Sequence, residues 1–372
     1  MRQQCWNHAS LALVACALLP MYVQAQHAET PTNQISNAAN LAVFIEGQVS
    51  VKRKGWTGYA PVVFGSSLRV GDLLHVDDSS HAKVVCSDLT LHDVPTGIGG
   101  VPCPSSPPVL QWVDGSLIDP TRGGLSDRSF PIVLSPRKTK LLSPYPLLRW
   151  TPVSGAIAYA VIVRGTNFNW SSRVRADESE MLYPKLAPKL SDGIDYKLIV
   201  QTTDHRSSDV EPGKGWGFRI LKPSDRNAVE KEQRSIENLG LLEGPTQFLI
   251  AYLYAAHDVN AEAIQRLESV SHKFKAAAVA RLLGDLYLKV GLTRQAEASY
   301  LNSLDLCKNE KDVEGEMLAH SALARIYEQA FGNRDSASQH FNAALALAEK
   351  IGDDLTADQT RKQLADLKKT RI

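Results

Sequence analysis

The sequence predicts a multidomain protein in which two all-β units precede an all-α array of helical repeats. Short runs of alternating apolar and polar residues, separated by Gly, Pro and Asp-Ser turns, continue from residue 41 to residue 222. A proline-rich seam at 130–146 divides this stretch in two. From residue 223 the apolar spacing becomes helical, and a pattern of Leu, Tyr and Ala recurs after 33 and then 40 residues.

Length and charge narrow the class of protein. At 372 residues the chain exceeds one typical core, which favours two or three folded units. Lys and Arg number 41 and Asp and Glu 40, so no net field points to nucleic acid or to an anionic surface. The hydrophobic fraction of 44% is ordinary for a folded protein. We therefore expect a largely folded chain without a nucleic-acid partner.

The first 40 residues differ from the rest. A charged start, an apolar run at 11–23 and a small-x-small triplet ending at Ala25 are typical of a secretory signal peptide over residues 1–25. A rival interpretation is a Leu-Val-Ala-Cys lipoprotein box with Cys16 as the lipidated residue, although the apolar run continues past it. Residues 26–40 are polar and unpatterned, as in a flexible leader. We expect a secreted or periplasmic protein whose mature chain has no transmembrane span.

Export would place the cysteines in an oxidising compartment. Cys86 and Cys103 enclose a short loop rich in Gly and Pro, and we expect a disulfide between them. Such a bridge contributes about 3 kcal/mol in the chain-entropy model. The alternative is two separate, half-buried thiols. Cys307 falls at the apolar end of a predicted helix and is expected to be a small core residue.

The first β unit, residues 41–130, carries three short motifs in order. They are Gly-Gln-Val-Ser-Val from Gly47, Leu-Arg-Val-Gly-Asp from Leu68 and Ser-His-Ala-Lys-Val from Ser80. This order resembles the FecR-type domain of exported bacterial proteins, and the resemblance implies a role in signalling or assembly at the envelope. The Gly- and Pro-rich segment 94–108 departs from the family pattern and is predicted to be a loop.

The second β unit, residues 131–222, has a tryptophan in an early strand and tyrosines in later ones. Trp150 precedes a turn, Tyr159 belongs to the next alternating strand, and Tyr196 begins a later one. Short strands with this placement of aromatics are typical of a β-sandwich. The unit resembles a fibronectin type III-like or related immunoglobulin-like module, in which these aromatic residues would belong to the core.

Residues 223–372 are predicted to be helical and to contain three repeats. The recurring positions are Ile250, Tyr254, Ala263 and Leu267, then Leu283, Tyr287, Ala296 and Tyr300, then Leu323, Tyr327, Ala337 and Phe341. This pattern resembles the tetratricopeptide repeat, in which Gly284 and the alanines would let helices approach closely while the aromatics fill the gaps. The last unit has one more residue between Tyr and Ala, which we assign to its turn. The longer second period is assigned to a polar stretch between helices at 307–316.

The resemblance to tetratricopeptide arrays also implies a concave face, lined by the first helix of each pair, that binds a partner segment. In this chain the face would include Phe248, Tyr252, Arg281, Asp285, Lys289, Arg325 and Glu328. The alternative is that these side chains are solvated or lie between repeats. Phe248 and Tyr252 have the further alternative of being core residues.

Motifs for catalysis or metal binding are lacking in the sequence. It contains no phosphate-binding Gly-x-x-x-x-Gly-Lys-Ser/Thr loop, no His-Glu-x-x-His and no Gly-x-Ser-x-Gly. One cluster of possible ligands, whose spacing fits no recognised metal site, comprises His75, Asp77, Asp78, His81, Cys86 and His92. The basic runs 52–54 and 137–140 are short, and a solvated strand edge or linker explains them. We expect no enzymatic activity, no cofactor and no metal.

Two functions fit this organisation. In the first, the protein is an exported, non-catalytic scaffold whose repeats bind a protein partner of the envelope or periplasm. In the second, the β units recognise an envelope ligand, such as a carbohydrate or the cell wall, and the repeats relay the signal or dimerise. An exposed aromatic platform on a β unit would favour the second function, and the candidates are Trp56, Tyr59 and Trp112.

Overall fold

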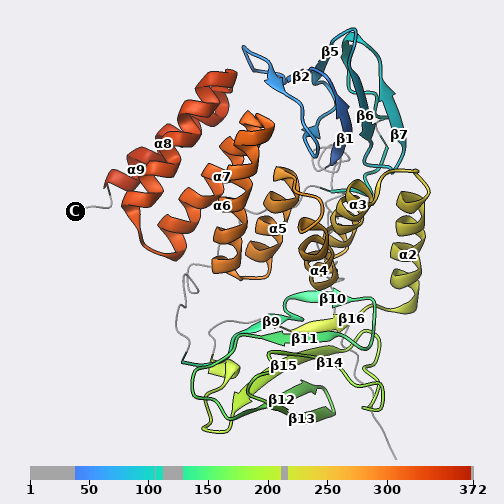
Figure 1. Ribbon diagram of the computed structural model, residues 1–372, viewed down its shortest axis with the longest axis vertical. Coiled ribbons are helices and arrows are strands. Elements are labelled where there is room, and N and C mark those ends of the chain that lie inside the picture. Colours follow the sequence, from blue (N-terminus) through green and yellow to red (C-terminus); the bar gives the residue numbers. More distant parts are fainter. Residues whose placement is uncertain (1–37, 105, 112–128, 211–216, 370–372) are drawn as a thin grey trace, which may run out of the picture.

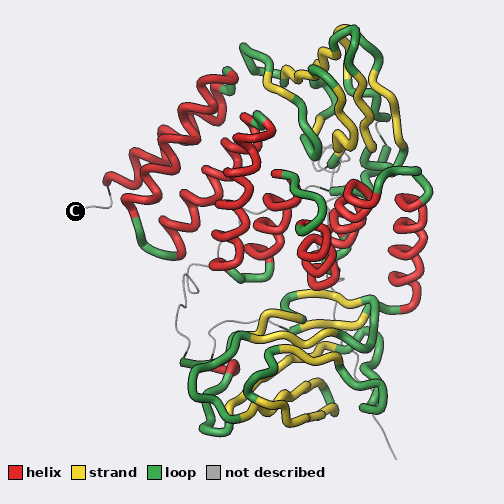
Figure 2. Tube along the Cα trace, viewed as in Figure 1, coloured by secondary structure: helices red, strands yellow, loops and turns green. Residues whose placement is uncertain are grey.

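The computed structural model describes residues 38–104, 106–111, 129–210 and 217–369. The expected signal peptide, the lipidation candidate Cys16 and most of the 26–40 leader lie outside these residues. The helices lie between two strand-rich units, the first at the top of Figure 1 and the second at the bottom, and Figure 2 shows the same division by element type. The predicted order, with strands first and helical repeats after them, is confirmed.

The first β unit is a pair of antiparallel four-stranded sheets, with strand orders β4-β1-β6-β7 and β3-β2-β5-β8. The strands are β1 Asn40–Glu46, β2 Val49–Lys52, β3 Ala60–Pro61, β4 Ser67–Leu68, β5 Leu73–Val76, β6 His81–Val85, β7 Leu91–Val94 and β8 Gly97–Gly100. One apolar cluster contains Val51 and Leu74 from one sheet and Leu68 and Val84 from the other. The two sheets therefore pack face to face, and the alternating apolar residues of each fill the space between them.

Strand β8 lies in the segment that the sequence predicts to be a loop. It pairs with β5 at the edge of its sheet and consists of three glycines and Ile98, which is 68% exposed. Such a strand buries almost no apolar side chain, so the alternation that identifies other strands is missing. A disulfide joins Cys86, just after β6, to Cys103, just after β8. The bridge therefore anchors β8, whose own side chains make little apolar contact.

The second β unit packs a five-stranded sheet, β10-β16-β15-β12-β13, on a three-stranded sheet, β14-β11-β9. The strands are β9 Val133–Ser135, β10 Thr139–Leu141, β11 Leu147–Trp150, β12 Ala158–Gly165, β13 Phe168–Arg175, β14 Glu180–Leu182, β15 Asp195–Thr202 and β16 Phe218–Ile220. β10 and β16 run parallel, and the other pairings between these strands are antiparallel. Trp150, Tyr159 and Tyr196 are buried in one cluster between the sheets, in the core positions expected for them.

The helical part begins with α2 and continues through three helix pairs to a last helix, α9. The elements are α2 Pro223–Glu237, α3 Glu243–Ala256, α4 Asn260–Ser271, α5 Ala277–Lys289, α6 Thr293–Glu310, α7 Val313–Arg325, the π turn η3 Ile326–Ala330, α8 Arg334–Ile351 and α9 Asp354–Lys369. α2 begins at a proline, whose fixed φ suits a first helical turn and whose missing N–H would have no partner there. Within the described ranges, no helix is both long and apolar enough to cross a membrane.

The extra residue of the third repeat lies in a helix and not in the predicted turn. Three residues connect the two helices of every pair, at 257–259, 290–292 and 331–333. The first helix of the third pair instead ends in η3, where the Phe331 N–H donates to the Ile326 carbonyl five residues back. The polar stretch 307–316 is likewise almost wholly helical, because it ends α6 and begins α7. The longer period therefore comes from longer helices.

A buried arginine joins the first β unit to the array. Arg53 is 5% exposed and donates to both carboxylate oxygens of Glu314, at the start of α7, at 2.6 and 2.7 Å. It also donates to Asp72 of its own unit at 2.6 Å, and its guanidinium lies 5.2 Å from the ring centroid of Trp56. The sequence assigns the run 52–54 to a solvated strand edge. That assignment is wrong for Arg53, because two carboxylates from different units meet its guanidinium.

The first β unit contacts the array from its beginning to its end. Near the beginning, the Phe64 ring packs against Phe248 of α3, with ring centroids 5.1 Å apart. Near the end, Trp56 is buried and its backbone pairs with Asp353, which lies between α8 and α9. With the Arg53 contact between these two, the unit lies along one edge of the array, where the first helices begin and the second helices end.

The second β unit holds the opposite edge, where the first helices of the pairs end. Arg137 is 1% exposed and donates through Nε to the Val290 carbonyl at the end of α5, at 2.7 Å. The Lys140 N–H donates to the Asp258 carbonyl, in the turn between α3 and α4, at 2.8 Å. The sequence assigns residues 137–140 to a solvated linker. That assignment is wrong for Arg137, which is buried. The carbonyl end of α5 favours a cation, which offsets part of the cost of burying the guanidinium.

Replacing Arg53 by alanine is predicted to lower the free energy of unfolding by about 3–5 kcal/mol, because the carboxylates of Asp72 and Glu314 are left buried without their cation. Denaturation by urea, followed by tryptophan fluorescence, measures this loss. The triple variant R53M/D72N/E314Q, which removes all three charges, is expected to recover most of it. A loss below about 1 kcal/mol for R53A would show that the pair behaves like an exposed salt bridge.

Candidate functional site

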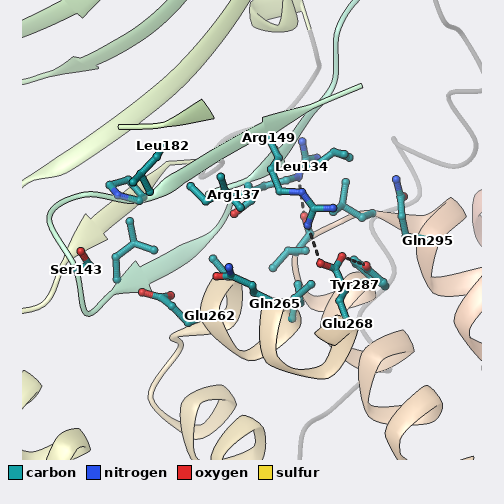
Figure 3. Close-up of a pocket in the computed structure, with 18 of the residues that line it drawn as sticks. Leu134, Arg137, Ser143, Arg149, Leu182, Glu262, Gln265, Glu268, Tyr287 and Gln295 are labelled. Atoms are coloured by element: carbon teal, nitrogen blue, oxygen red, sulfur yellow. Dashed lines mark hydrogen bonds and ion pairs between the residues drawn. The ribbon is translucent and has the colours of Figure 1, made fainter. Parts of the chain in front are cut away.

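A cavity of about 220 Å³ lies between the second β unit and the array (Figure 3). Leu134, Arg149 and Leu182 line it from the β unit, and Glu262 and Glu268 line it from α4. The lining mixes apolar side chains with a few charged ones, which is the usual composition of a ligand pocket. It is a candidate site because it lies at a junction of two units, where such pockets are common.

One side of this cavity is a fixed network of three polar side chains. Arg149 pairs with Glu268 at 2.7 Å, and the other oxygen of Glu268 accepts a hydrogen bond from the Tyr287 hydroxyl at 2.6 Å, as Figure 3 shows. Burial, together with the bond to Glu268, raises the pKa of Tyr287. Tyr287, expected from the sequence as a repeat-packing residue, thus also links α5 to α4 and, through Arg149, to β11. All three groups have partners, so this side of the cavity is structural.

The other side holds a carboxyl group that is only half satisfied. Glu262, in the first turn of α4, accepts a hydrogen bond from the Leu142 N–H at 2.9 Å through Oε1. Its Oε2 is buried and has no hydrogen-bond partner in the part of the chain that the structure describes. Burial raises the pKa of Glu262 to about 7. The carboxyl therefore changes charge near neutral pH at a contact between the two units.

The residues predicted to line the concave face are partly used inside the molecule. Phe248 and Tyr252 are buried, and Phe248 packs on Phe64 of the first β unit, so neither lines an open face. Arg281 is also buried and pairs with Asp312 at 3.4 Å, which joins the second repeat to the third. For these three positions the structure shows the core and inter-repeat roles that the sequence left open as alternatives.

Two further members of the predicted face hold helices together. Lys289 donates to the Ala255 carbonyl at 2.9 Å and pairs with Asp258 at 2.9 Å, which links α5 to the preceding pair. Asp285 accepts a hydrogen bond from the Tyr300 hydroxyl at 2.5 Å, which links α5 to α6. Both side chains are half-buried, and their polar atoms are engaged within the array.

Arg325 and Glu328 differ from the other predicted positions. Both are half-buried and lie at the π turn of the third repeat. The Arg325 Nε is buried without a hydrogen-bond partner among the described residues, and burial raises the pKa of Glu328. A π turn inside an α-helix is frequently found at a functional site. At this turn the Arg325 Nε is thus a polar atom of the predicted face that the described residues leave without a partner.

The predicted cluster of possible metal ligands does not converge. Among residues with a described position, no group of three or more His, Cys, Asp or Glu side chains is arranged to hold a metal ion. His75 lies 3.7 Å from Asp77, with both side chains almost half exposed. Cys86 is engaged in the disulfide.

The cavity and its carboxyl group have no clear signal in the sequence. Arg149 occupies an outward position of β11, where any half-buried strand would carry a polar residue. Glu262 is an acidic residue in the first turn of a helix, which is the commonest place for one. Arg149 and Glu262 line a cavity only because the second β unit docks against the array.

Comparison with known families identifies the repeats. A family model described as "Tetratricopeptide repeat" matches residues 280–314 and 319–355, which confirms the predicted repeats in this part of the chain. The crystal structure of MamA shares 13% identity, covers 40% of this chain and 93% of its own, and has a TM-score of 0.29. The crystal structure of BtubC (BKLC) from P. vanneervenii shares 14% identity, covers 40% of this chain and 74% of its own, and has a TM-score of 0.26. No curated protein matches the chain.

The raised pKa of Glu262 predicts that stability depends on pH. Its pKa of about 7 in the folded protein lies above the ordinary value of 4.5, so folding favours the protonated form. The group therefore costs stability progressively as pH rises from about 4.5 to about 7, and the full cost remains above that range. Glu262→Gln keeps an acceptor for the Leu142 N–H and removes the charge. We expect E262Q to be more stable than the wild type at pH 8, by on the order of 3 kcal/mol.

Urea denaturation at pH 5, 6.5 and 8 tests this expectation, and the advantage of E262Q should shrink steadily toward pH 5. Glu178→Gln is a matched control, since Glu178 is exposed on the same β unit as Leu142 and makes no ion pair in the described structure. An advantage of E262Q that is the same at all three pH values would contradict the assignment.

Proposed function

We propose that this protein is a non-catalytic scaffold whose tetratricopeptide array binds a protein partner. The observation that carries the proposal is the π turn of the third repeat, where Arg325 and Glu328 are both half-buried and the Arg325 Nε has no hydrogen-bond partner among the described residues. A bound segment would meet the accessible parts of these half-buried side chains, with a carbonyl or carboxylate facing the arginine and a backbone N–H facing the glutamate. The other positions of the predicted face serve the internal packing of the array.

The two β units give the array a preset shape. Arg53 fixes the start of α7 to the first unit, and Arg137 fixes the end of α5 to the second. A surface that is already ordered loses less conformational entropy when it binds. In this proposal the β units therefore hold the repeats in the conformation that the partner meets.

We further propose that the first β unit is a FecR-type domain, and contacts between its motif residues support this. Gly47 has a φ of +82°, and a Cβ there would lie 2.3 Å from the Ser80 hydroxyl oxygen. That hydroxyl accepts a hydrogen bond from the Gln48 N–H at 2.8 Å. Asp72 accepts hydrogen bonds from the Arg53 guanidinium and the Arg69 N–H, at 2.6 and 2.9 Å. The first and third motifs thus contact each other, and the second is bonded to Arg53, two residues after the first.

For the second β unit we propose a fibronectin type III-like or related immunoglobulin-like module. Tyr196, at the start of β15, accepts a hydrogen bond through its hydroxyl oxygen from the Ser191 N–H at 2.8 Å. A tyrosine bonded to the backbone a few residues upstream, at the corner leading into a strand, is a hallmark of immunoglobulin-like sandwiches. The arrangement of a three-stranded on a five-stranded sheet is also in keeping with this proposal.

The proposed place of action is outside the cytoplasm, in the envelope or periplasm. The disulfide between Cys86 and Cys103 supports export, because such bridges persist in oxidising compartments. The apolar, small-x-small beginning of the sequence supports it as well. A FecR-type domain in such a compartment would fit a role in envelope signalling or assembly.

Ligand recognition by the β units is the second candidate function, and one residue favours it. Tyr59 is 42% exposed, with the His75 ring centroid 6.3 Å and the Lys52 Nζ 5.8 Å from its ring. An exposed tyrosine flanked by polar groups suits stacking on a sugar ring. Trp56 is buried against the array and forms no platform, and Trp112 lies outside the described residues.

The double variant R325A/E328A is predicted to lose a protein that the wild-type chain captures from an extract of its native cells, because both groups meet the partner in this proposal. Captured proteins are identified and quantified by mass spectrometry. The variant should fold, since the Arg325 Nε has no hydrogen-bond partner among the described residues and both side chains are only half-buried. Circular dichroism and thermal denaturation check this.

Asp305→Ala with Lys308→Ala is the matched control, because these exposed residues of α6 also comprise one acid and one base. It is expected to retain the partner. Equal capture by the wild type, R325A/E328A and D305A/K308A would place the interaction outside the third repeat and contradict the proposal. A Tyr59→Ala variant in the same experiment shows whether binding instead depends on the first β unit.

A further inference from the structure

The second β unit and the array border an open recess whose charged lining residues are mostly cations. Its volume is about 920 Å³. Strands β10, β12, β15 and β16 form one wall, and the α3–α4 turn and the end of α5 form the other. The six cations are Lys138, Lys140, Arg164, Lys197, Arg219 and Lys289, and the two carboxylates are Asp195 and Asp258. This excess of positive charge is local, since the whole chain has a formal net charge of +1.

The strand register places like charges side by side. Arg164 on β12 lies directly opposite Lys197 on β15, and Lys140 on β10 lies directly opposite Arg219 on β16. Apart from the half-buried Gly165, the neighbouring residues along each strand are buried, so the cations share the outer face of the sheet. Like charges directly opposite each other destabilise a sheet. Carboxylates offset part of this repulsion, since Arg219 also lies opposite Asp195 on β15 and Lys197 pairs with Asp209. Arg164 has no such carboxylate within the described residues.

Internal ion pairs satisfy only part of this charge. Asp258 pairs with both Lys140, at 3.2 Å, and Lys289, at 2.9 Å. Arg219 makes two hydrogen bonds to Asp195, at 2.8 and 2.6 Å. Lys197 pairs with Asp209, at the outer side of the recess. Lys138 and Arg164 are exposed, and neither side chain makes an ion pair or hydrogen bond within the described residues. These two cations are available to an incoming anion.

We propose that this recess binds an acidic, extended segment of a partner protein, with Lys138 and Arg164 contacting its carboxylates. The cations span four neighbouring strands, and at about 4.8 Å between strands the row is on the order of 15 Å long. That length matches four or five extended residues, at roughly 3.3 Å each, and exceeds one small anion.

The shape and charge pattern of the recess favour a peptide over other anions. The recess has one wall on the sheet and one on the helical part, and carboxylates are interspersed among its cations, which a uniformly anionic membrane surface does not complement. Asp195 and Asp258 among the cations suit a peptide that also offers N–H donors, and disfavour a uniformly charged polymer. The site lies on the β unit and uses neither Arg325 nor Glu328. It can fail without affecting the proposed role of the third repeat, and the reverse also holds.

Binding of a fluorescein-labelled octaglutamate peptide to the full chain tests the proposal, by anisotropy at low and moderate salt. The variant K138E/R164E is expected to weaken binding by about tenfold or more. Its fold should persist, because Arg164→Glu replaces a like-charge pair with an opposite pair facing Lys197. Circular dichroism confirms folding before affinities are compared.

Lys185→Glu with Lys189→Glu is the matched control, because these exposed lysines of the same unit lie outside the recess and make no ion pair in the described structure. It changes the net charge equally and should weaken binding by less than about twofold. Equal weakening by both double variants, or no measurable binding by the wild type, would overturn the proposal. Tighter binding to phosphatidylglycerol vesicles than to octaglutamate, lost in K138E/R164E, would also overturn it and assign the recess to a membrane surface.

Discussion

The buried ion pair between Arg53 and Glu314 is the interaction on which the arrangement of the three parts most depends. A guanidinium with little access to water is costly unless carboxylates meet it, and here one comes from its own unit and one from α7. The pair therefore fixes how the first β unit docks on the array, since a shifted docking would leave charges buried without partners. Phe64 and Trp56 extend this contact in both directions along the same edge.

Arg137 plays the corresponding part at the opposite edge, where it bonds the carbonyl end of α5. Both edges are occupied, and five of the seven predicted positions on the concave face are engaged inside the molecule, so fewer polar groups of that face remain for a partner. The third repeat, farthest along the chain, keeps such groups at Arg325 and Glu328. The recess beside the second β unit keeps them at Lys138 and Arg164. A scaffold of this kind would offer two separate contact points held at a constant distance by the two buried arginines.

The repeats could be predicted from the sequence because their small and aromatic residues recur at fixed intervals, as Tyr254, Tyr287 and Tyr327 do. The π turn could not be predicted, because an extra residue gives the same spacing between Tyr327 and Ala337 whether it lies in the helix or in the turn. β8 could not be recognised as a strand, because its glycines leave no alternation of apolar and polar side chains. Arg53 and Arg137 looked like solvated residues because each stands in a short basic run, and only the neighbouring unit makes them buried. The cavity around Glu262 could not be predicted for the same reason, because it forms only where the second β unit meets the array.

Hydrogen exchange at two backbone amides tests most directly whether the array is held between the β units. The Thr57 N–H donates to the Gly352 carbonyl at 3.1 Å, and the Lys140 N–H donates to the Asp258 carbonyl at 2.8 Å. If the units are docked as described, both amides exchange slowly, at rates close to those of amides inside the two sheets. Exchange at the rate of an exposed loop, with the sheet amides still protected, would show that the units are hinged and would contradict this account.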